Sequence, residues 1–232
     1  MASPLRNLKS AWRRLLRLGT STLDGVRLVT AADRVSRDVR NGIFKETYEE
    51  PERILIRAAL RPGDRVLEVG GGVGFISLLC AKIVGAANVL TYEANPAMRE
   101  TILANYRLNG LTPTLRARAV TARGGDITFF VSKNIISSSL YQRAGGEAVT
   151  IPSDAIDAIL AEWRPTVLVM DVEGAEVDIL PASQLAGLRA LILELHPHVV
   201  GEDALARMRA HLAGLGFRES SVLHKSSLFL RS

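Results

Sequence analysis

From Asp64 onward, short apolar runs alternate with longer stretches of helical periodicity, and this alternation limits the fold more than any other feature. The apolar runs are 65–69, 88–93, 114–120, 166–172 and 190–196, and the helical stretches are 75–85, 96–110, 153–163 and 203–216. Short strands separated by helices of about 10 to 15 residues are typical of βαβ units, whose parallel strands are covered on both faces by helices. The pattern therefore predicts a Rossmann-like, doubly wound α/β fold.

Two further segments modify the predicted sheet. The chain ends in two β-rich runs, 217–223 and 226–232, joined by a short turn, which predicts an antiparallel last strand. Residues 121–151 contain two glycine pairs around polar and apolar runs, and they predict a β-hairpin or a loop insertion. The serines at 137–139 in this segment are either part of a solvated loop, which is the simpler interpretation, or a loop at the acceptor site.

The length and the turn at Pro62-Gly63 indicate how the chain is divided. A chain of 232 residues, 47% of them hydrophobic, suits one α/β domain and is too short for two ordinary ones. A helical stretch at 49–61 ends at the Pro-Gly pair, where a helix stop is expected. We therefore expect an N-terminal helical extension or lid over residues 1–60 and a single sheet domain over 61–232.

The basic charge of the chain is concentrated at its N-terminus. The formal net charge is +5, yet residues 1–20 hold five Lys or Arg and no acid, which leaves 24 basic and 24 acidic residues elsewhere. Apolar residues in this segment recur at helical spacing, at Leu5, Leu8, Trp12, Leu15 and Leu16. The favoured interpretation is a helix that packs Leu and Trp on the domain with its basic side solvated. Docking on an anionic membrane, or a lid over an anionic substrate, stays open.

Several functional classes are disfavoured by composition. The single cysteine, Cys80, permits no disulfide within the chain, which favours a reducing, cytoplasmic location. No apolar run approaches 18 residues, so no membrane-spanning helix is expected. The neutral remainder of the chain and its 5% aromatic content disfavour nucleic-acid binding.

A glycine-rich loop lies directly between the first predicted strand and its helix, with the sequence EVGGGVG from Glu68 to Gly74. Glycines allow a tight turn and a close approach of the backbone to a ligand. The next strand ends in Glu93, 19 residues after Gly74. In a doubly wound sheet this carboxylate lies beside the loop and can accept hydrogen bonds from two ribose hydroxyls. The glycine-rich loop together with Glu93 therefore predicts a cofactor that contains a nucleoside.

The loop favours S-adenosylmethionine over a nicotinamide dinucleotide. The dinucleotide pattern requires glycine at the sixth position from Gly70, where this chain has Phe75. S-adenosylmethionine has no phosphate to hold, and Glu68 could orient its cationic amine directly or through water. An NAD(P) site and an ordinary βα turn without a ligand remain the alternatives.

Four motifs resemble those of the FkbM-type methyltransferases, a branch of the class I S-adenosylmethionine-dependent enzymes. They are VLEVGGGVGFIS, YEANP, VLVMDVEGAEVDIL and LILELHP, and the resemblance spans about 48–197. The run from Asp171 to Glu176 is the most selective of the matches. The resemblance implies methyl transfer, usually to a hydroxyl of a sugar, a polyketide or another small metabolite. It also implies a seven-stranded sheet whose last strand is antiparallel.

Carried over by position, the resemblance assigns cofactor contacts along the sheet. Around the methionine moiety it places Glu68, Gly70, Gly72 and Gly74. It places Glu93 at the ribose, Ala94 and Asn95 beside the adenine, and Ala119 and Val120, at the end of the 114–120 strand, in the adenine pocket. Tyr48 lies where class I chains commonly fold over the cofactor. Directly before the Asp171–Glu176 run, family members often carry Lys or a similar polar residue, whereas this chain has Met170. The first 47 residues, where substrate contacts are expected, match no family, so the identity of the methyl acceptor stays open.

Residues that could perform chemistry follow the fourth and fifth strands, whose carboxyl ends border the ligand site of an open α/β sheet. Asp171 and Glu173 follow the fourth strand, while Glu194 and His196 lie two apart on the fifth and so share a side. We expect these four to form a cluster, with Asp171 nearest the methyl group and His196 or Glu194 as the base. Glu176, in the first turn of a helix, is expected to complement the helix dipole. Such a cluster could hold Mg²⁺, but its spacing is not diagnostic, so no metal is assigned.

The sequence therefore predicts an S-adenosylmethionine-dependent methyltransferase, most simply an O-methyltransferase acting on a hydroxylated small metabolite or sugar. An NAD(P)-dependent oxidoreductase and a non-catalytic protein that binds S-adenosylmethionine are the alternatives. A small molecule is the expected partner, with peripheral membrane contact through residues 1–20 open. The sequence predicts no oligomeric state.

Overall fold

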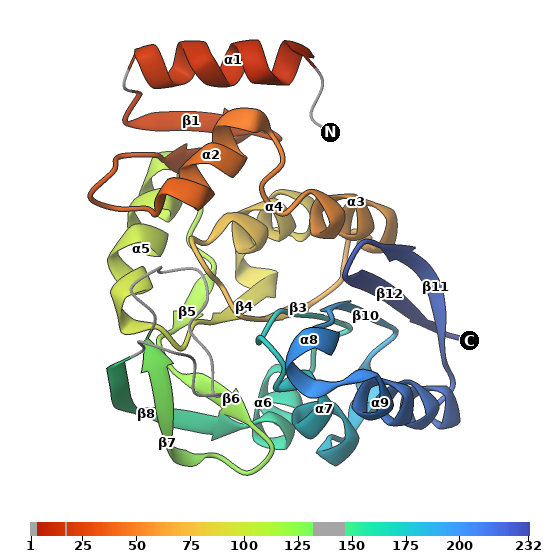
Figure 1. Ribbon diagram of the computed structural model, residues 1–232. Helices are drawn as coiled ribbons and strands as arrows, with labels where there is room; N and C mark the ends of the chain where they lie inside the picture. The colour runs from red at the N-terminus through yellow and green to blue at the C-terminus, as the bar shows by residue number, and fades with distance from the viewer. Residues whose placement is uncertain (1–3, 17, 132–146) are drawn as a thin grey trace.

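The computed structural model describes residues 4–16, 18–131 and 147–232 (Figure 1). Its central sheet has seven strands in the order β11-β12-β10-β9-β3-β4-β5. Their bounds are β3 (Val66–Val69), β4 (Val89–Tyr92), β5 (Thr114–Arg116), β9 (Val167–Met170), β10 (Ala190–Glu194), β11 (Phe217–Leu223) and β12 (Ser226–Arg231). Strands β5, β4, β3, β9 and β10 pair in parallel, whereas β12 is antiparallel to both of its neighbours. The predicted doubly wound sheet with an antiparallel last strand is confirmed, and β12 lies between β10 and β11.

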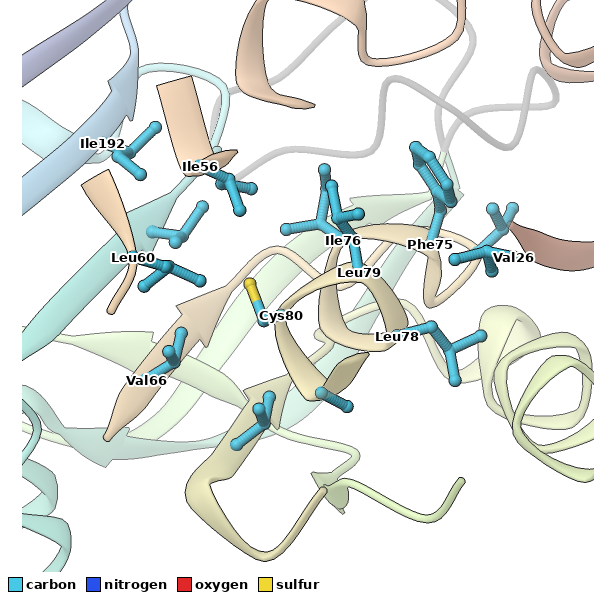
Figure 2. Close-up of a cluster of buried hydrophobic side chains, with 14 of the residues drawn as sticks. Val26, Ile56, Leu60, Val66, Phe75, Ile76, Leu78, Leu79, Cys80 and Ile192 are labelled. Carbon is cyan, nitrogen blue, oxygen red and sulfur yellow. The ribbon is translucent and has the colours of Figure 1, made fainter. Parts of the chain in front are cut away.

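Helices cover both faces of this sheet because its strands are apolar on both sides. The strands β3, β4 and β9 are buried at every position, as expected for a parallel sheet. The helices on one face are α3 (Glu50–Ala59), α4 (Phe75–Val84) and α5 (Arg99–Asn109), and those on the other are α6 (Ile156–Trp163), α7 (Glu176–Ile179) and α9 (Glu202–Gly214). Figure 2 shows Ile76, Leu79 and Cys80 of α4 beside Val66 of β3 within the first of these layers.

The segment after β5 forms a second, three-stranded sheet in the order β6-β8-β7. Its strands are β6 (Ala119–Thr121), β7 (Gly125–Val131) and β8 (Glu147–Ala155). The antiparallel pairing of β7 with β8 confirms the hairpin insertion. The serines at 137–139 lie outside the described residues. Because β8 runs to Ala155, the following helix begins three residues later than predicted, at Ile156.

One strand prediction was wrong. Residues 114–120 do not form a single strand, because β5 ends at Arg116 and Ala119 already belongs to β6 of the second sheet. Between them, Arg118 Nε lies 2.8 Å from Asp154 Oδ1 on β8, an ion pair that ties the chain to the second sheet. Ala119 and Val120 therefore do not close the third strand of the central sheet.

The N-terminal segment contains more than helices. It consists of α1 (Pro4–Leu15), β1 (Thr20–Leu23), β2 (Val26–Val29) and α2 (Arg37–Lys45), followed by α3. The antiparallel hairpin of β1 and β2 was not predicted. It is fixed to α5 by Asn105 and Asn109, whose side chains accept hydrogen bonds from the backbone of Val29 and Arg27 at 2.7 and 2.9 Å. The division of the chain at residue 60 stays a proposal.

The orientation expected for α1 was also wrong. Leu8, Trp12, Leu15 and Leu16 are exposed, by 58 to 75%, instead of packing on the domain. The side chain of Leu5 is outside the described part of the chain. Arg6 and Arg13 instead face the domain, because Glu50 and Glu46, at the start of α3 and the end of α2, offer them carboxylates. Ionic pairing, which the sequence pattern does not reveal, decides which face of the helix is buried.

Short helical segments complete the chain. They are α8 (Pro197–Val200) and the 3-10 turns Ala86–Asn88, Pro96–Met98, Leu180–Ala182 and Leu185–Gly187. Among the described residues, none of the helices combines the length and apolar character needed to cross a bilayer.

Candidate functional site

A pocket opens at the carboxyl ends of β3, β4, β9 and β10, the edge where ligands of open α/β sheets bind. The glycine loop and Glu93 line one side, and Asp171 and Glu194 line the other. The N-terminal segment supplies a further wall, with Val35 and Tyr48 among its residues. Residues from both predicted groups, for cofactor binding and for chemistry, thus line one cavity, whereas Gly74 and His196 do not line it.

The glycines of the loop are required by close contacts. Gly70 has φ +97°, and a Cβ there would lie 1.9 Å from the carbonyl oxygen of Asp171. Gly74 precedes α4 with φ +77°, and its Cβ would lie 3.0 Å from Ile102 Cγ2 on α5. Gly72 has φ +53° and lies close to Tyr48, whose hydroxyl would be 3.5 Å from a Cβ. Bare backbone therefore lets β9, α5 and Tyr48 approach the loop and leaves the cavity open above it.

Glu93 is held in place by the loop that it faces. Its Oε2 accepts a hydrogen bond from Gly72 N at 2.6 Å and its Oε1 from Asn95 N at 2.7 Å. Burial raises the pKa of Glu93 to about 7, although these backbone bonds oppose the shift. Each carboxylate oxygen can accept a second hydrogen bond, which suits the two hydroxyls of a ribose.

Glu68 lies beneath the loop and is 1% exposed. Thr91 Oγ1 donates a hydrogen bond to its Oε2 at 2.6 Å, while its Oε1 is buried without a hydrogen-bond partner. Burial raises the pKa of this carboxyl to about 8. Asp171 Oδ1 is likewise buried without a hydrogen-bond partner at the same pocket. Two unsatisfied carboxyl oxygens are well suited to a cationic ligand, and so the residues present fit the positively charged S-adenosylmethionine.

The four residues that the sequence assigned to the adenine also line the pocket, namely Ala94, Asn95, Ala119 and Val120. Their contact with a cofactor stays a proposal. Asn95 also accepts a hydrogen bond from Ala97 N through Oδ1 at 3.0 Å, which caps the turn Pro96–Met98. Met98 and Arg118 also line the pocket and were missed. Nothing in the local sequence marks them, since Arg118 reaches the site only because the chain changes sheets.

The four residues predicted as a chemical cluster do converge. His196 Nε2 lies 3.6 Å from Asp171 Oδ1, 3.6 Å from Glu173 Oε2 and 3.8 Å from Glu194 Oε1. The His196 side chain is 3% exposed, and the residue follows β10 just before α8. The convergence is observed, while a catalytic role for these side chains stays a proposal.

Glu176 does more than complement a helix dipole. It is fully buried, and its Oε2 accepts a hydrogen bond from Gly174 N at 2.9 Å. Its Oε1 accepts from His196 N at 3.2 Å and lies 3.4 Å from His196 Nδ1. A carboxylate at Nδ1 favours the tautomer that carries a proton there, which leaves Nε2 free to accept one. This orienting contact was not predicted, because His196 lies 20 residues away from Glu176 in the chain.

The start of α3 brings two more carboxylates, Glu49 and Glu52, to the same pocket. Glu52 is 6% exposed and accepts a hydrogen bond from Ser226. Glu49 has φ +50°, and burial together with the charges of Glu52 and Glu194 raises its pKa to about 8. Strained backbone of this kind is most often retained at functional sites. Four acids at 46–52, clustered before a helix, are the signal that could have indicated them.

Burial and the crowding of acids also shift the pKa values of Asp171, Glu194 and His196 in this cluster. Burial, followed by the charges of Glu194 and Glu49, raises the pKa of Asp171 well above its usual value. Burial alone would lower the pKa of His196, but the hydrogen bond and charge of Glu176 and the charge of Glu173 raise it. Such shifts are typical of sites that move protons.

The chain was compared with protein-family models and with curated proteins. A model described as the methyltransferase FkbM domain matches residues 46–219. A segment of 54 residues is 41% identical to the ribosomal protein L11 methyltransferase of Bacillus cytotoxicus, covering 23% of this chain and 17% of that protein. Another of 58 residues is 43% identical to the protein-L-isoaspartate O-methyltransferase of Methylorubrum extorquens, covering 25% of each. The chain thus aligns with a quarter or less of these curated relatives.

Solved structures show the same fold at low sequence identity. A methyltransferase from Pyrococcus furiosus matches with a TM-score of 0.52 and 15% identity, over 99% of this chain and 100% of that one. The precorrin-6y C5,15-methyltransferase of Geobacter metallireducens matches with a TM-score of 0.50 and 14% identity, over 88% and 97%. These similarities show the Rossmann-like methyltransferase fold.

Proposed function

The chain belongs to the FkbM methyltransferase family of S-adenosylmethionine-dependent enzymes, and on this basis we propose that it methylates a hydroxyl oxygen of a small metabolite or sugar. The observation that carries the proposal is the convergence of Asp171, Glu173 and Glu194, which line the pocket of the glycine loop, on the Nε2 of His196. Family membership favours methyl transfer over the nicotinamide-dependent alternative.

The cofactor would occupy the side of the pocket formed by the loop. Gly70 and Gly72 leave room for the methionine moiety, Glu93 would hold the ribose, and Ala94 and Val120 would border the adenine. When bound, S-adenosylmethionine supplies a methyl carbon made electrophilic by its positive sulfur. The positive charges of the ligand would lower the raised pKa values of Glu68 and Asp171, and the ionised carboxylates would then balance those charges.

The protein's own chemistry is the removal of the acceptor proton. We assign this to His196 Nε2, with Glu176 as a positioning residue that holds Nδ1. The carboxylates of Asp171, Glu173 and Glu194 stabilise the imidazolium that forms, since all three lie within 4 Å of Nε2. A polyhydroxylated acceptor suits the same carboxylates, because each accepts hydrogen bonds from neighbouring hydroxyls.

Calorimetry and turnover test this function. We expect S-adenosylhomocysteine to bind and NAD not to bind. With methyl-deuterated S-adenosylmethionine and a panel of sugars and hydroxylated metabolites, mass spectrometry should show label on an oxygen. Binding of NAD alone would reject the assignment. Binding of S-adenosylhomocysteine without turnover on the panel would favour the non-catalytic alternative, and label on a protein or an amine would reject the hydroxyl acceptor.

A metal offers a different route to the same proton transfer. Within the described residues, the ligand atoms of Asp171, Glu194 and His196 lie within 4.8 Å of one another, and those of Glu49, Glu52 and Glu194 do so too. We propose that the His196–Glu176 pair suffices without a metal. In the turnover assay, activity should be unchanged by EDTA, whereas loss in EDTA and recovery with Mg²⁺ would assign the role to a cation.

Replacing Glu176 with glutamine tests the positioning role through pH dependence. His196 must be neutral to accept a proton, so kcat/KM should rise with pH through its pKa, which lies above the usual 6.5. An amide at position 176 removes the charge of Glu176, the partner that contributes most to raising this pKa, so E176Q should move the acidic limb of the profile to lower pH even though Glu173 and Glu194 remain. The plateau of kcat/KM at high pH should fall about tenfold or more, because the tautomer of His196 is no longer fixed. If the plateau falls but the acidic limb of the kcat/KM profile stays at the same pH, the role of Glu176 is purely structural.

A further inference from the structure

Helix α1 presents an apolar face that no described part of the chain covers. Leu8, Trp12, Leu15 and Leu16 follow one helical stripe and are 60, 58, 75 and 60% exposed. Figure 1 shows α1 on the outside of the molecule, beyond β1 and α2. Contiguous apolar side chains this exposed on a monomer mark an interaction surface.

The opposite face of α1 fixes this orientation. Arg6 contacts both carboxylate oxygens of Glu50, at 2.7 and 3.2 Å. Arg13 donates to the carbonyl of Phe44 at 2.7 Å and to Glu46 Oε1 at 3.0 Å. Ser10 is also buried, which shows that this face of the helix packs on the domain. Because the ion pairs of Arg6 and Arg13 hold this face inward, the apolar stripe on the opposite face points outward.

Three arginines near α1 are not neutralised by a carboxylate of the described residues. Arg14, Arg37 and Arg40 line a surface pocket between α1 and α2, together with Leu18 and Phe44. Within the described part of the chain, none of these three arginines forms an ion pair with a carboxylate, and the buried Nε of Arg40 lacks a hydrogen-bond partner. Residues 1–45 carry ten Lys or Arg against three Asp, so the surrounding segment is also cationic.

We propose that α1 docks on an anionic membrane surface, with its apolar stripe in the interfacial layer and Arg14, Arg37 and Arg40 on lipid phosphates. An anionic membrane has two layers that suit these side chains. The leucines and the tryptophan can enter the acyl-chain layer, while the arginines bind the charged headgroups above it. A symmetric dimer through the same face would bring the cationic pockets of two copies together, and their repulsion disfavours that occupant. The proposal is independent of the reaction at the methyltransferase site.

Vesicle binding of the full chain tests the proposal. We expect the protein to sediment with vesicles of phosphatidylcholine and phosphatidylglycerol, and to bind pure phosphatidylcholine vesicles at least tenfold more weakly. L15Q and R14E should each lower the partition coefficient on anionic vesicles at least fivefold. Matched controls are V222Q and R218E on β11, because Val222 is 55% exposed and Arg218 is also exposed. These two variants should bind as the unmodified chain does.

Trp12 provides a direct probe of insertion. Its emission should shift to shorter wavelength on anionic vesicles, and the shift should disappear in W12F, which keeps an aromatic side chain but removes the reporter. Failure to bind anionic vesicles, or equal binding by L15Q and the unmodified chain, would overturn the proposal. So would a dimer in sedimentation equilibrium that L15Q dissociates, if the vesicles are not bound.

Discussion

Replacing His196 with asparagine is expected to lower kcat by about 10²- to 10⁴-fold, the range that a positioned general base contributes. Asparagine is smaller and can still donate a hydrogen bond toward Glu176, so the pocket should stay intact. The affinity for S-adenosylhomocysteine should change by less than about threefold, because we assign cofactor binding to the glycine loop and Glu93. Single-turnover kinetics and calorimetry measure the two quantities separately.

A neighbouring histidine offers the matched control. The ring of His198 lies 5.8 Å from that of His196, but its side chain is exposed and outside the carboxylate cluster. H198N should therefore retain nearly full kcat. If H196N also retains it, His196 is not the base, and the role passes to Asp171 or Glu194. The loss of the acidic limb of the pH profile in H196N would separate a role in proton transfer from a structural one.

Substituting alanine for Gly70 is expected to cost roughly 2–5 kcal/mol in the free energy of unfolding. The new Cβ would lie 1.9 Å from the carbonyl oxygen of Asp171, so β9 and the loop must separate. Overpacking of this kind costs about 1–3 kcal/mol, and a positive φ adds about 1–2 kcal/mol for an L-residue. Urea denaturation at low temperature measures the change, and calorimetry should show S-adenosylhomocysteine binding weakened by an order of magnitude or more.

Substitution of Gly63 separates the effect of the contact with Asp171 from the effect of the positive φ. It has φ +90°, similar to that of Gly70, but nothing lies within 4 Å of a Cβ built there. G63A should therefore show only the backbone strain, about 1–2 kcal/mol, and bind S-adenosylhomocysteine normally. Equal losses of stability in the two variants would show that the contact with Asp171 is not what requires glycine at position 70.

Local patterns predicted the elements of the sheet well. Apolar runs such as VLEV and VLVM became strands buried on both faces, and the glycine loop fell between β3 and α4 as expected. The failures occurred where a tertiary contact overrode the pattern. The run 114–120 has an alternating strand-like composition throughout, yet its second half pairs with β8 of another sheet, where Arg118 also forms an ion pair with Asp154.

The candidate site was predictable only in part. Asp171, Glu173, Glu194 and His196 were brought together by the rule that parallel strands end at one edge of a sheet. Glu49 and Glu52 could not be placed there, because they reach the pocket from a helix outside the predicted sheet domain. The contact of Glu176 with His196 depends on how a short helix after β9 faces the end of β10. No spacing rule relates those two positions.

The sequence by itself determined the alternation of strands and helices in the sheet domain, the glycine loop and the acidic residues at the strand ends. Each of these depends on periodicity or on backbone freedom, which are properties of neighbouring residues in the chain. Only the tertiary structure decided which face of α1 is buried. Its leucines suggested an inward apolar face, but carboxylates more than thirty residues away pair with its arginines and turn that face outward. A hydrophobic pattern shows that a helix has two faces, whereas the charges on the surface that receives it determine which face is covered.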